Sequence, residues 1–597
     1  MPCRLPLVLS CALALCAAHL SHVAGARPPN IVVILADDQG WGDLSGNGNT
    51  NLSTPNIDSL ARSGATFDRF YACSVCAPTR AEFFTGRYFL RTGVTGVSTG
   101  LERLNLDEST IFEAFQEAGY ATGTFGKWHN GTQHPYHPNA RGVDEFYGFC
   151  SGHWGHYFDA VIDHNNTLVR GQGYIIDDLT DRAISFMETH REKPFFCYIP
   201  YCTPHSPMQV PDRFYDPIAT KDLTLHHRDP HKEDDAHLRA ALAMCENIDW
   251  NVGRILDQLD ALGLAEDTVV VYFSDNGPNG WRWNGDMKGK KGDVDEGGLR
   301  VPCLMRWPGK IPPDKTIPQI AGATDLLPTL TELAGIPHTG TKPLDGRSLK
   351  PLLLEQEHHS PDWPDRAIIS ARHHGGKASV RTQRFRLDQD GHLFDMVADP
   401  GQRHDVATDH PDENRRLAAL AHSFLQETRP TATASKDRPF TVGHSLTTPL
   451  PARDGIPHGT VRRSNSAPNC SYFTGWSSTD DSITWDIEVG SPGEYEATLY
   501  YTCAPEDTGA ELELGFAGAS VRHTVSEAHD PPLVGQESDR ADRGSESFVK
   551  DFRPLALGRM HLPSTRGTLT LRALTIPGRS APDVRYVMLT RTNQTNP

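Results

Sequence analysis

Two pairs of polar residues carry the side chains best suited to bind a hard cation. Asp37 and Asp38 follow one continuous apolar run, and Asp275 and Asn276 follow another. All four side chains offer oxygen ligands, which favours Ca²⁺ or Mg²⁺ over a metal that prefers thiolate. Each pair alone also has the composition of a turn, because Asp-Gln-Gly and Asp-Asn-Gly are good turn sequences. Two pairs in the same context favour a metal site.

The segment Cys76-Ala77-Pro78-Thr79-Arg80 is the second candidate for chemistry. A free cysteine is usually a buried core residue. Together with Cys73 it forms a Cys-x-x-Cys pattern, which occurs in redox pairs and in halves of zinc sites. A zinc site would need a second such pair nearby, and a redox domain would be a small βαβ unit, whereas this domain is much larger. From the residues alone, a core cysteine and a reactive cysteine both remain open.

The elements that must position these residues follow from hydrophobic patterning. Three apolar runs are typical of strands buried on both faces of a parallel sheet: 31–35, 195–199 and 268–273. Between them lie helices with recognisable ends, including a capping-box pattern at Thr110 and Glu113 and a long amphipathic helix over 235–263. In open α/β sheets ligands bind at the carboxyl ends of strands, which is where both acidic pairs lie.

The patterning changes twice further along the chain. Short apolar stretches and a helical pattern at 414–425 indicate a smaller α+β unit, and after Asn469 strict alternation such as Ile483, Trp485, Ile487 and Val489 indicates a β-sandwich. The expected organisation is a leader at 1–26, a catalytic α/β domain at 27–345, an α+β unit at 346–435, a linker at 436–465 and a β-sandwich at 466–597.

Composition and the N-terminus restrict the classes of function. The chain has 597 residues and a formal net charge of −18, which argues against non-specific nucleic-acid binding. Arg4, an apolar stretch and an Ala-Gly-Ala site ending at Ala26 are typical of a cleaved secretory signal peptide, so we expect a secreted or periplasmic protein. No internal run is long and apolar enough to predict a membrane span.

The segment 74–86, Ser-Val-Cys-Ala-Pro-Thr-Arg-Ala-Glu-Phe-Phe-Thr-Gly, resembles the maturation signature of type I sulfatases in the alkaline phosphatase superfamily. The segment 119–129 is similar to the second signature of that family and departs from it only at Phe125. Further similar segments lie at 203–205, 291–298, 300–302, 393–395 and 399–400, and the resemblance covers about 29–425. It implies a mixed, mainly parallel sheet flanked by helices, followed by the smaller α+β unit.

The resemblance also implies a mechanism. A separate formylglycine-generating enzyme would read the Cys-x-Pro-x-Arg segment and oxidise Cys76 to formylglycine, whose hydrate attacks the sulfur of a sulfate ester. Asp37, Asp38, Asp275 and Asn276 would hold one Ca²⁺ ion beside residue 76. Arg80, Lys127 and Lys291 would surround the sulfuryl oxygens with positive charge. His129 would accept a proton during sulfate release, and His205 and Lys291 would protonate the leaving group.

Other functions compete with a sulfatase. Formylglycine-dependent phosphonate monoester hydrolases or phosphodiesterases share the Cys-x-Pro-x-Arg segment, but the segments at 126–129 and 203–205 favour a sulfatase. A catalytically inactive, glycan-binding protein is disfavoured because the nucleophile, the metal pairs and the positive charges occur together. We expect an arylsulfatase-like enzyme that acts on a sulfated carbohydrate or an aryl sulfate, and exo action is favoured because the chain is acidic.

The remaining candidates concern substrate binding. The predicted sandwich resembles carbohydrate-binding-like modules; Trp476 is a candidate for stacking on a sugar, whereas the phase of Trp485 favours core packing. Cys470 and Cys503 are a candidate disulfide. Three basic residues near Lys291 either extend an anion-binding groove or lie in a solvated loop: Arg282, Lys288 and Lys290. Of the 28 histidines, we assign the cluster from His226 to His237 to a solvated loop.

Overall fold

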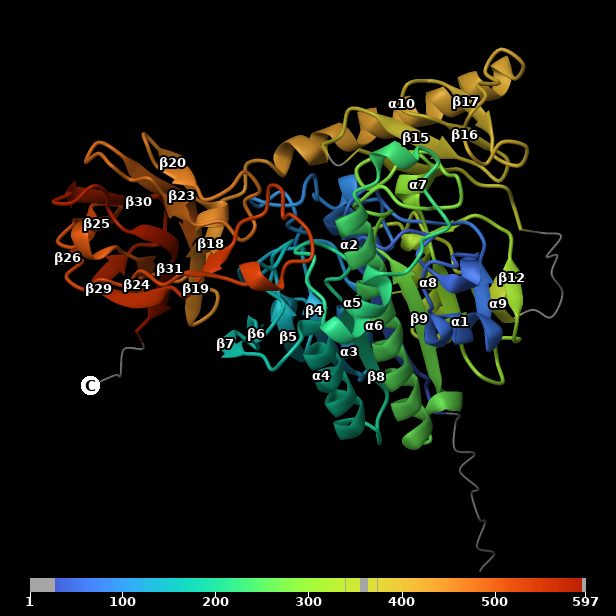
Figure 1. Cartoon of the computed structure of the whole chain (residues 1–597), viewed down its shortest axis with the longest axis horizontal. Coiled ribbons are helices and arrows are strands. Elements are labelled where there is room, and N and C mark those ends of the chain that lie inside the picture. The colour runs from blue at the N-terminus through green and yellow to red at the C-terminus, as the bar shows by residue number, and fades with distance from the viewer. Residues whose placement is uncertain (1–26, 339, 355–362, 373, 593–597) are drawn as a thin grey trace, which may run out of the picture.

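The computed structural model describes residues 27–338, 340–354, 363–372 and 374–592. The predicted leader at 1–26 lies outside these residues. Within them, no helix combines the length and the apolar composition needed to cross a membrane. Figure 1 shows a large α/β body, a helix and small sheet at its upper edge, and a separate β-rich body formed by the C-terminal part of the chain.

The α/β body contains a ten-stranded, mainly parallel sheet among the described residues. Its strand order is β12-β2-β11-β9-β1-β8-β4-β5-β6-β7. The five central strands, from β9 to β5, run parallel. The strands are β1 (Asn30–Ala36), β2 (Ala65–Phe67), β4 (Ala121–Lys127), β5 (Glu145–Phe149), β6 (Val161–His164), β7 (Thr167–Arg170), β8 (Phe195–Pro200), β9 (Thr268–Ser274), β11 (Cys303–Arg306) and β12 (Lys315–Ile317). The predicted fold class is confirmed.

Helices cover both faces of this sheet, which explains the continuous apolar strands. Alternate residues of β1 enter two different cores: Val32 and Ile34 pack on one face, whereas Ile31, Val33 and Leu35 pack on the other. The first face is covered by α1 (Pro55–Arg62), α4 (Ile175–Thr189) and α6 (Asp235–Ala261), and the second by α2 (Cys76–Thr85), α3 (Ile111–Glu117) and α8 (Leu326–Leu333). The capping box predicted at Thr110 and Glu113 is present.

A smaller α+β unit packs beside α2. It consists of the antiparallel sheet β14 (Ile368–Ala371), β15 (Ala378–Arg381), β16 (Phe385–Leu387) and β17 (Leu393–Asp395), with α10 (Pro411–Ala434) across it. Val380, Leu417 and Phe424 share a core with Ala77 and Ala81 of α2. Helix α10 extends beyond the predicted 414–425 to Ala434, because its final turns contain Pro430 and no large apolar residue and so carry no strong amphipathic signal.

The C-terminal body contains two six-stranded sheets that enclose one apolar core. The longer strands are β23 (Ser482–Val489), β24 (Gly493–Thr502), β25 (Glu511–Phe516), β26 (Ala519–Thr524), β29 (Arg553–Leu562), β30 (Arg566–Thr575) and β31 (Asp583–Arg591). The predicted alternation is present in β23, where Ile483, Trp485, Ile487 and Val489 are all buried.

Three expectations for this part of the chain differ from the structure. The segment 436–465 is not a linker, because β18 (Phe440–Val442) pairs with β23 and β19 (Thr447–Pro451) pairs with β31. Both strands are short, and β19 contains two prolines, which hides the alternation. Trp476 is 1% exposed and lies in the core, so it does not present a ring to a sugar. Cys470 and Cys503 are both free thiols; the Cys470 Sγ instead donates to the His153 carbonyl at 3.2 Å.

Candidate active site

The predicted site residues lie around the carboxyl ends of four parallel strands. Asp37 follows β1, Asp275 follows β9, Lys127 ends β4, and His205 lies just beyond β8. Because β4, β8, β1 and β9 are consecutive neighbours in the sheet, these ends meet at one edge. The order of the strands in the sheet, and not their order along the chain, therefore brings these residues together.

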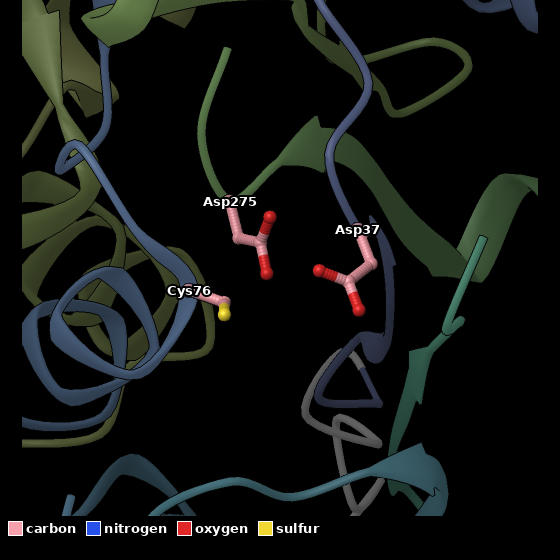
Figure 2. Close-up of side chains that lie close together, drawn as sticks. All are labelled: Asp37, Cys76 and Asp275. Atoms are coloured by element: carbon pink, nitrogen blue, oxygen red, sulfur yellow. The ribbon is translucent and has the colours of Figure 1, made fainter. Parts of the chain in front are cut away.

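Cys76 faces this edge from the first turn of α2. Figure 2 shows its side chain directed toward the carboxylates of Asp37 and Asp275, and one ligand atom from each of the three lies within 4.8 Å of the others. The residue is 3% exposed. The N-terminal end of a helix carries partial positive charge, so its position there favours a nucleophile on which negative charge develops.

The acidic pairs provide a set of buried oxygens that is incompletely hydrogen-bonded. Asn276 Nδ2 donates to Asp38 Oδ1 at 2.8 Å, which turns the amide oxygen of Asn276 away from that contact. Among the described residues, Asp37 Oδ1 and Asn276 Oδ1 are buried and have no hydrogen-bond partner. Buried polar atoms are normally satisfied. These two unpaired oxygens, one from a carboxylate and one from an amide, lie in a set with two further carboxylates. Such a set of oxygen ligands fits a hard cation such as Ca²⁺.

Each carboxylate of this set is paired with a basic side chain. Lys127 Nζ lies 2.6 Å from Asp37 Oδ2, Arg80 Nη2 lies 2.8 Å from Asp275 Oδ2, and Lys291 Nζ lies 2.6 Å from Asp38 Oδ1. The Arg80 guanidinium also donates to the Lys127 carbonyl, so it connects α2 to β4. Arg80 is thus held by the protein, whereas each lysine ammonium retains donors for a ligand.

The pKa values divide the carboxylates into two kinds. Burial alone would raise the pKa of Asp37, but Lys127 and the surrounding cations hold it far below its usual range. Burial, and after it the charge of Asp37, raise the pKa of Asp275 to about 7. Burial also raises the pKa of the Cys76 thiol. A negative charge on Asp275 or on Cys76, in addition to that on Asp37, is therefore unfavourable unless a further cation is present.

Both candidate histidines are held as neutral bases. Burial, with Lys127 next in importance, keeps the pKa of His129 well below its usual value, and burial followed by Lys291 lowers the pKa of His205. His129 Nε2 lies 2.7 Å from the Val97 carbonyl, so this nitrogen must carry the hydrogen. Its Nδ1 is buried and without a hydrogen-bond partner in the described chain, and is free to accept a proton.

The three basic residues near Lys291 differ in exposure: Arg282 is buried, whereas Lys288 and Lys290 are half-buried. Arg282 is 1% exposed and donates through Nε and Nη2 to Asp43 at 2.8 and 2.7 Å. Lys290 Nζ donates to the Asn279 carbonyl, and Lys288 Nζ lies 3.1 Å from Asp295. These side chains position the loop that carries Lys291.

Two residues near the site were not identified from the sequence. His153 is fully buried with its ring centroid 5.5 Å from that of His205, and Glu546 Oε2 lies 3.4 Å from His153 Nε2. Neither belongs to a recognisable motif, and Glu546 comes from the C-terminal body. Patterning within one segment cannot reveal a contact between units so far apart in the chain.

Known proteins resemble this chain over most of its length. The family model described as Sulfatase matches residues 29–336, and that of N-sulphoglucosamine sulphohydrolase, C-terminal, matches 290–429. N-acetylgalactosamine-6-sulfatase of Mus musculus is 32% identical over 382 residues, 58% of this chain and 69% of that protein. N-acetylgalactosamine-6-O-sulfatase of Bacteroides thetaiotaomicron is 28% identical over 67% of this chain and 93% of its own. The crystal structure of Ps i-CgsB in complex with k-i-k-neocarrahexaose gives a TM-score of 0.60 at 29% identity, covering 67% of this chain and 93% of that chain.

Proposed function

This chain belongs to the sulfatase family of sulfuric ester hydrolases, and we propose that it releases sulfate from a carbohydrate using formylglycine at residue 76 and one Ca²⁺ ion. The observation that carries the proposal is the meeting of Cys76 with Asp37 and Asp275 at the carboxyl edge of the sheet. Two orphaned buried oxygens in the same set support the cation.

The residues that would hold Ca²⁺ are Asp37, Asp38, Asp275 and Asn276, with the side chain of residue 76 beside them. When bound, the ion would lower the pKa of a coordinated hydroxyl and neutralise charge on the ester. Asp37 is kept ionised by Lys127, so it would be ready to act as a ligand. Asn276 would offer Oδ1, because its Nδ2 already donates to Asp38.

Formylglycine would supply a hydroxyl nucleophile in place of the thiol. In the folded protein every residue of α2 is buried. A formylglycine-generating enzyme would therefore have to reach the segment from Cys76 to Arg80 before the domain closes. We accordingly propose that maturation precedes folding, and that the leader at 1–26 exports the protein.

We propose a proton acceptor and a proton donor for the reaction among the side chains of the site. His129 Nδ1 would accept a proton from the side chain of residue 76, because its Nε2 is occupied by the Val97 carbonyl. The charge of Asp38 raises the pKa of Lys291 against the opposing effect of burial, so its ammonium remains charged and would bind a sulfuryl oxygen or protonate the leaving oxygen. His205 lies beside Asp38, but burial and then Lys291 lower its pKa. Its neutral ring would therefore donate a hydrogen bond to the leaving oxygen, and Lys291 would supply the proton.

A carbohydrate substrate is supported by the relatives. Two are named N-acetylgalactosamine 6-sulfatases, and Ps i-CgsB was crystallised with k-i-k-neocarrahexaose. We therefore propose a sulfated sugar as the substrate class, with aryl sulfates as small surrogates.

The test compares two small esters. Protein co-produced with a formylglycine-generating enzyme is supplied with Ca²⁺ and assayed on para-nitrophenyl sulfate and on a para-nitrophenyl phosphonate monoester, with Cys76→Ala as the control. A higher kcat/KM for the sulfate, lost in the control, is expected. A higher kcat/KM for the phosphonate would instead assign the chain to phosphonate hydrolysis.

A further inference from the structure

A loop of the C-terminal body is docked on the catalytic body beside the site. It connects β27 (Leu533–Val534) to β28 (Val549–Lys550), and Figure 1 shows this C-terminal chain reaching across to the α/β body. Gln209 Nε2 donates to the Gly535 carbonyl at 2.8 Å and to Asp539 Oδ1 at 2.7 Å. Arg540 N donates to the Met208 carbonyl at 2.9 Å. These contacts fix the loop next to the segment that carries His205.

Arg543 fixes the second half of the loop. It is 5% exposed, donates to the Gly155 carbonyl at 2.6 Å, and its Nε donates to Asp539 Oδ2 at 2.6 Å. The Cys470 thiol, from the same C-terminal body, donates to the His153 carbonyl. The loop and the segment 153–155 therefore form one packed interface, so the position of Glu546 relative to His153 is set by several independent contacts.

Glu546 and His153 are polar groups with unused hydrogen-bonding capacity. Glu546 Oε2 and both ring nitrogens of His153 are buried and make no well-formed hydrogen bond within the described ranges, although Oε2 lies 3.4 Å from Nε2 and the Ser206 backbone lies close to the ring. The His153 side chain is 0% exposed. Leaving such groups unsatisfied costs stability, so their retention points to a ligand that completes them.

The charges of the active site act on Glu546. Burial raises its pKa to about 7, although Lys291 and Lys127 oppose that rise. Burial, followed by the neighbouring His205, keeps the pKa of His153 well below its usual value. The pair thus joins a neutral imidazole to a carboxyl group that interacts with both lysines of the site.

We propose that Glu546 and His153 bind hydroxyl groups of the sugar ring that carries the sulfate ester, so that the C-terminal body completes the substrate site. This inference rests on the proposed function. A carboxylate repels sulfate, so the pair belongs on the leaving-group side, to which the proposed function assigns the neighbouring His205. A carboxyl and an imidazole can donate and accept hydrogen bonds, and a sugar hydroxyl can do both.

The experiment compares a sugar sulfate with an ester that has no hydroxyl. Matured wild type, Glu546→Ala, Glu546→Gln and the exposed loop control Glu537→Gln are assayed with Ca²⁺. The substrates are para-nitrophenyl sulfate and a panel of sulfated monosaccharides that includes N-acetylgalactosamine 6-sulfate. For the best sugar, Glu546→Ala should raise KM about tenfold or more, with a much smaller effect on the aryl sulfate. Glu546→Gln should recover part of the loss, and Glu537→Gln should match wild type.

Thermal unfolding separates binding from a structural role. The Glu546→Gln midpoint should equal or exceed that of wild type, because the substitution removes a buried carboxyl without a partner. A lower midpoint with equal losses on both substrates would overturn the inference. So would a wild type that hydrolyses the aryl sulfate but no sulfated sugar. Failure of wild type on every sulfate ester would refute the proposed function itself, and the inference with it.

Discussion

The catalytic α/β body and the C-terminal sheets bury very different side chains. At the carboxyl edge of the parallel sheet, Asp37, Asp275, Arg80 and Lys127 are all at most 1% exposed and lie together. The core between the C-terminal sheets is instead aliphatic and aromatic. The catalytic body thus holds a group of paired charges at one edge of its sheet, whereas the core between the C-terminal sheets contributes to stability.

This difference in buried side chains indicates which part of the molecule is suited to catalysis. A buried charge is costly, and it persists at the sheet edge because opposite charges and a helix end compensate it. The C-terminal body also places buried or half-buried charges where it meets the catalytic body, at Arg543, Glu546 and Arg453. Arg453 Nη2 lies 2.8 Å from Glu102 Oε1. If activity depends on the buried charges, substitutions at the sheet edge should lower activity most, and substitutions away from it should affect mainly stability.

Replacing the nucleophile should cause the largest loss. Cys76→Ala is expected to lower kcat/KM for para-nitrophenyl sulfate by at least about a thousandfold, because no hydroxyl can then attack sulfur. The thermal midpoint should stay close to that of wild type, since the change removes one atom from a helix end. Steady-state kinetics and calorimetry on the same preparations measure both. Residual activity within about tenfold of wild type would exclude residue 76 as the nucleophile.

Removing the cation should affect activity and stability together. Chelation is expected to lower the rate of sulfate release about a hundredfold to a thousandfold and to lower the thermal midpoint, because a ligand held at about a hundredfold above its Kd stabilises the folded state by about 2.7 kcal/mol. Added Ca²⁺ should restore both. Asp37→Asn serves as the matched variant and should lose the Ca²⁺-dependent shift. An identical midpoint with and without chelator would contradict the metal site.

Neutralising one cation of the site should give an intermediate loss. Lys127→Met is expected to lower kcat about a hundredfold to a thousandfold, because a fixed positive charge beside the sulfuryl group is removed. The comparison variant is Lys193→Met, an exposed lysine after α4, which should retain wild-type kcat. Equal kcat values for the two variants would show that Lys127 serves only the fold.

A core substitution in the C-terminal body should lower stability and leave activity almost unchanged. Ile487→Ala in β23 is expected to cost that body about 2–5 kcal/mol, because it opens a cavity in an apolar core. Hydrolysis of para-nitrophenyl sulfate, measured well below the unfolding transition, should stay within about twofold of wild type. A large loss of activity in the folded variant would mean that the core of the C-terminal body is coupled to the active site through the contacts between the two bodies.

A buried carboxyl away from the cations should influence stability alone. Burial raises the pKa of Glu82 in α2 to about 8. Between pH 4.5 and 8 the unfolded chain therefore ionises this group while the folded chain does not, so stability falls as pH rises, by at most about 1.4 kcal/mol per unit. Glu82→Gln should flatten this fall. Denaturant unfolding of unmatured protein at pH 6 and pH 8 provides the measurement, and an unchanged slope would contradict it.

Local patterns were sufficient to predict much of the fold. Continuous apolar runs identified β1, β8 and β9 because each is packed on both faces, and the capping box identified α3. The segment 436–465 escaped prediction because its short strands obtain their order from pairing with β23 and β31. Local composition carries no trace of that pairing.

Some residues of the candidate site could also be predicted from the sequence, and others could not. Asp37 and Asp275 could be placed together because parallel strands end at a common edge, and the resemblance to sulfatases selected Lys127, His129 and His205 from many similar residues. Glu546 could not be found, since its proximity to His153 arises from docking between two bodies. A contact of that kind exists only in three dimensions.

A crystal structure of the matured protein grown with Ca²⁺ would test the proposed metal and formylglycine site most directly. We predict one cation peak in contact with Asp37, Asp38, Asp275 and Asn276, and density at residue 76 for an oxygen-bearing side chain beside that peak. A residue 76 that remains a thiol after co-production with the maturation enzyme, or a cation bound elsewhere while these oxygens stay without one, would contradict it.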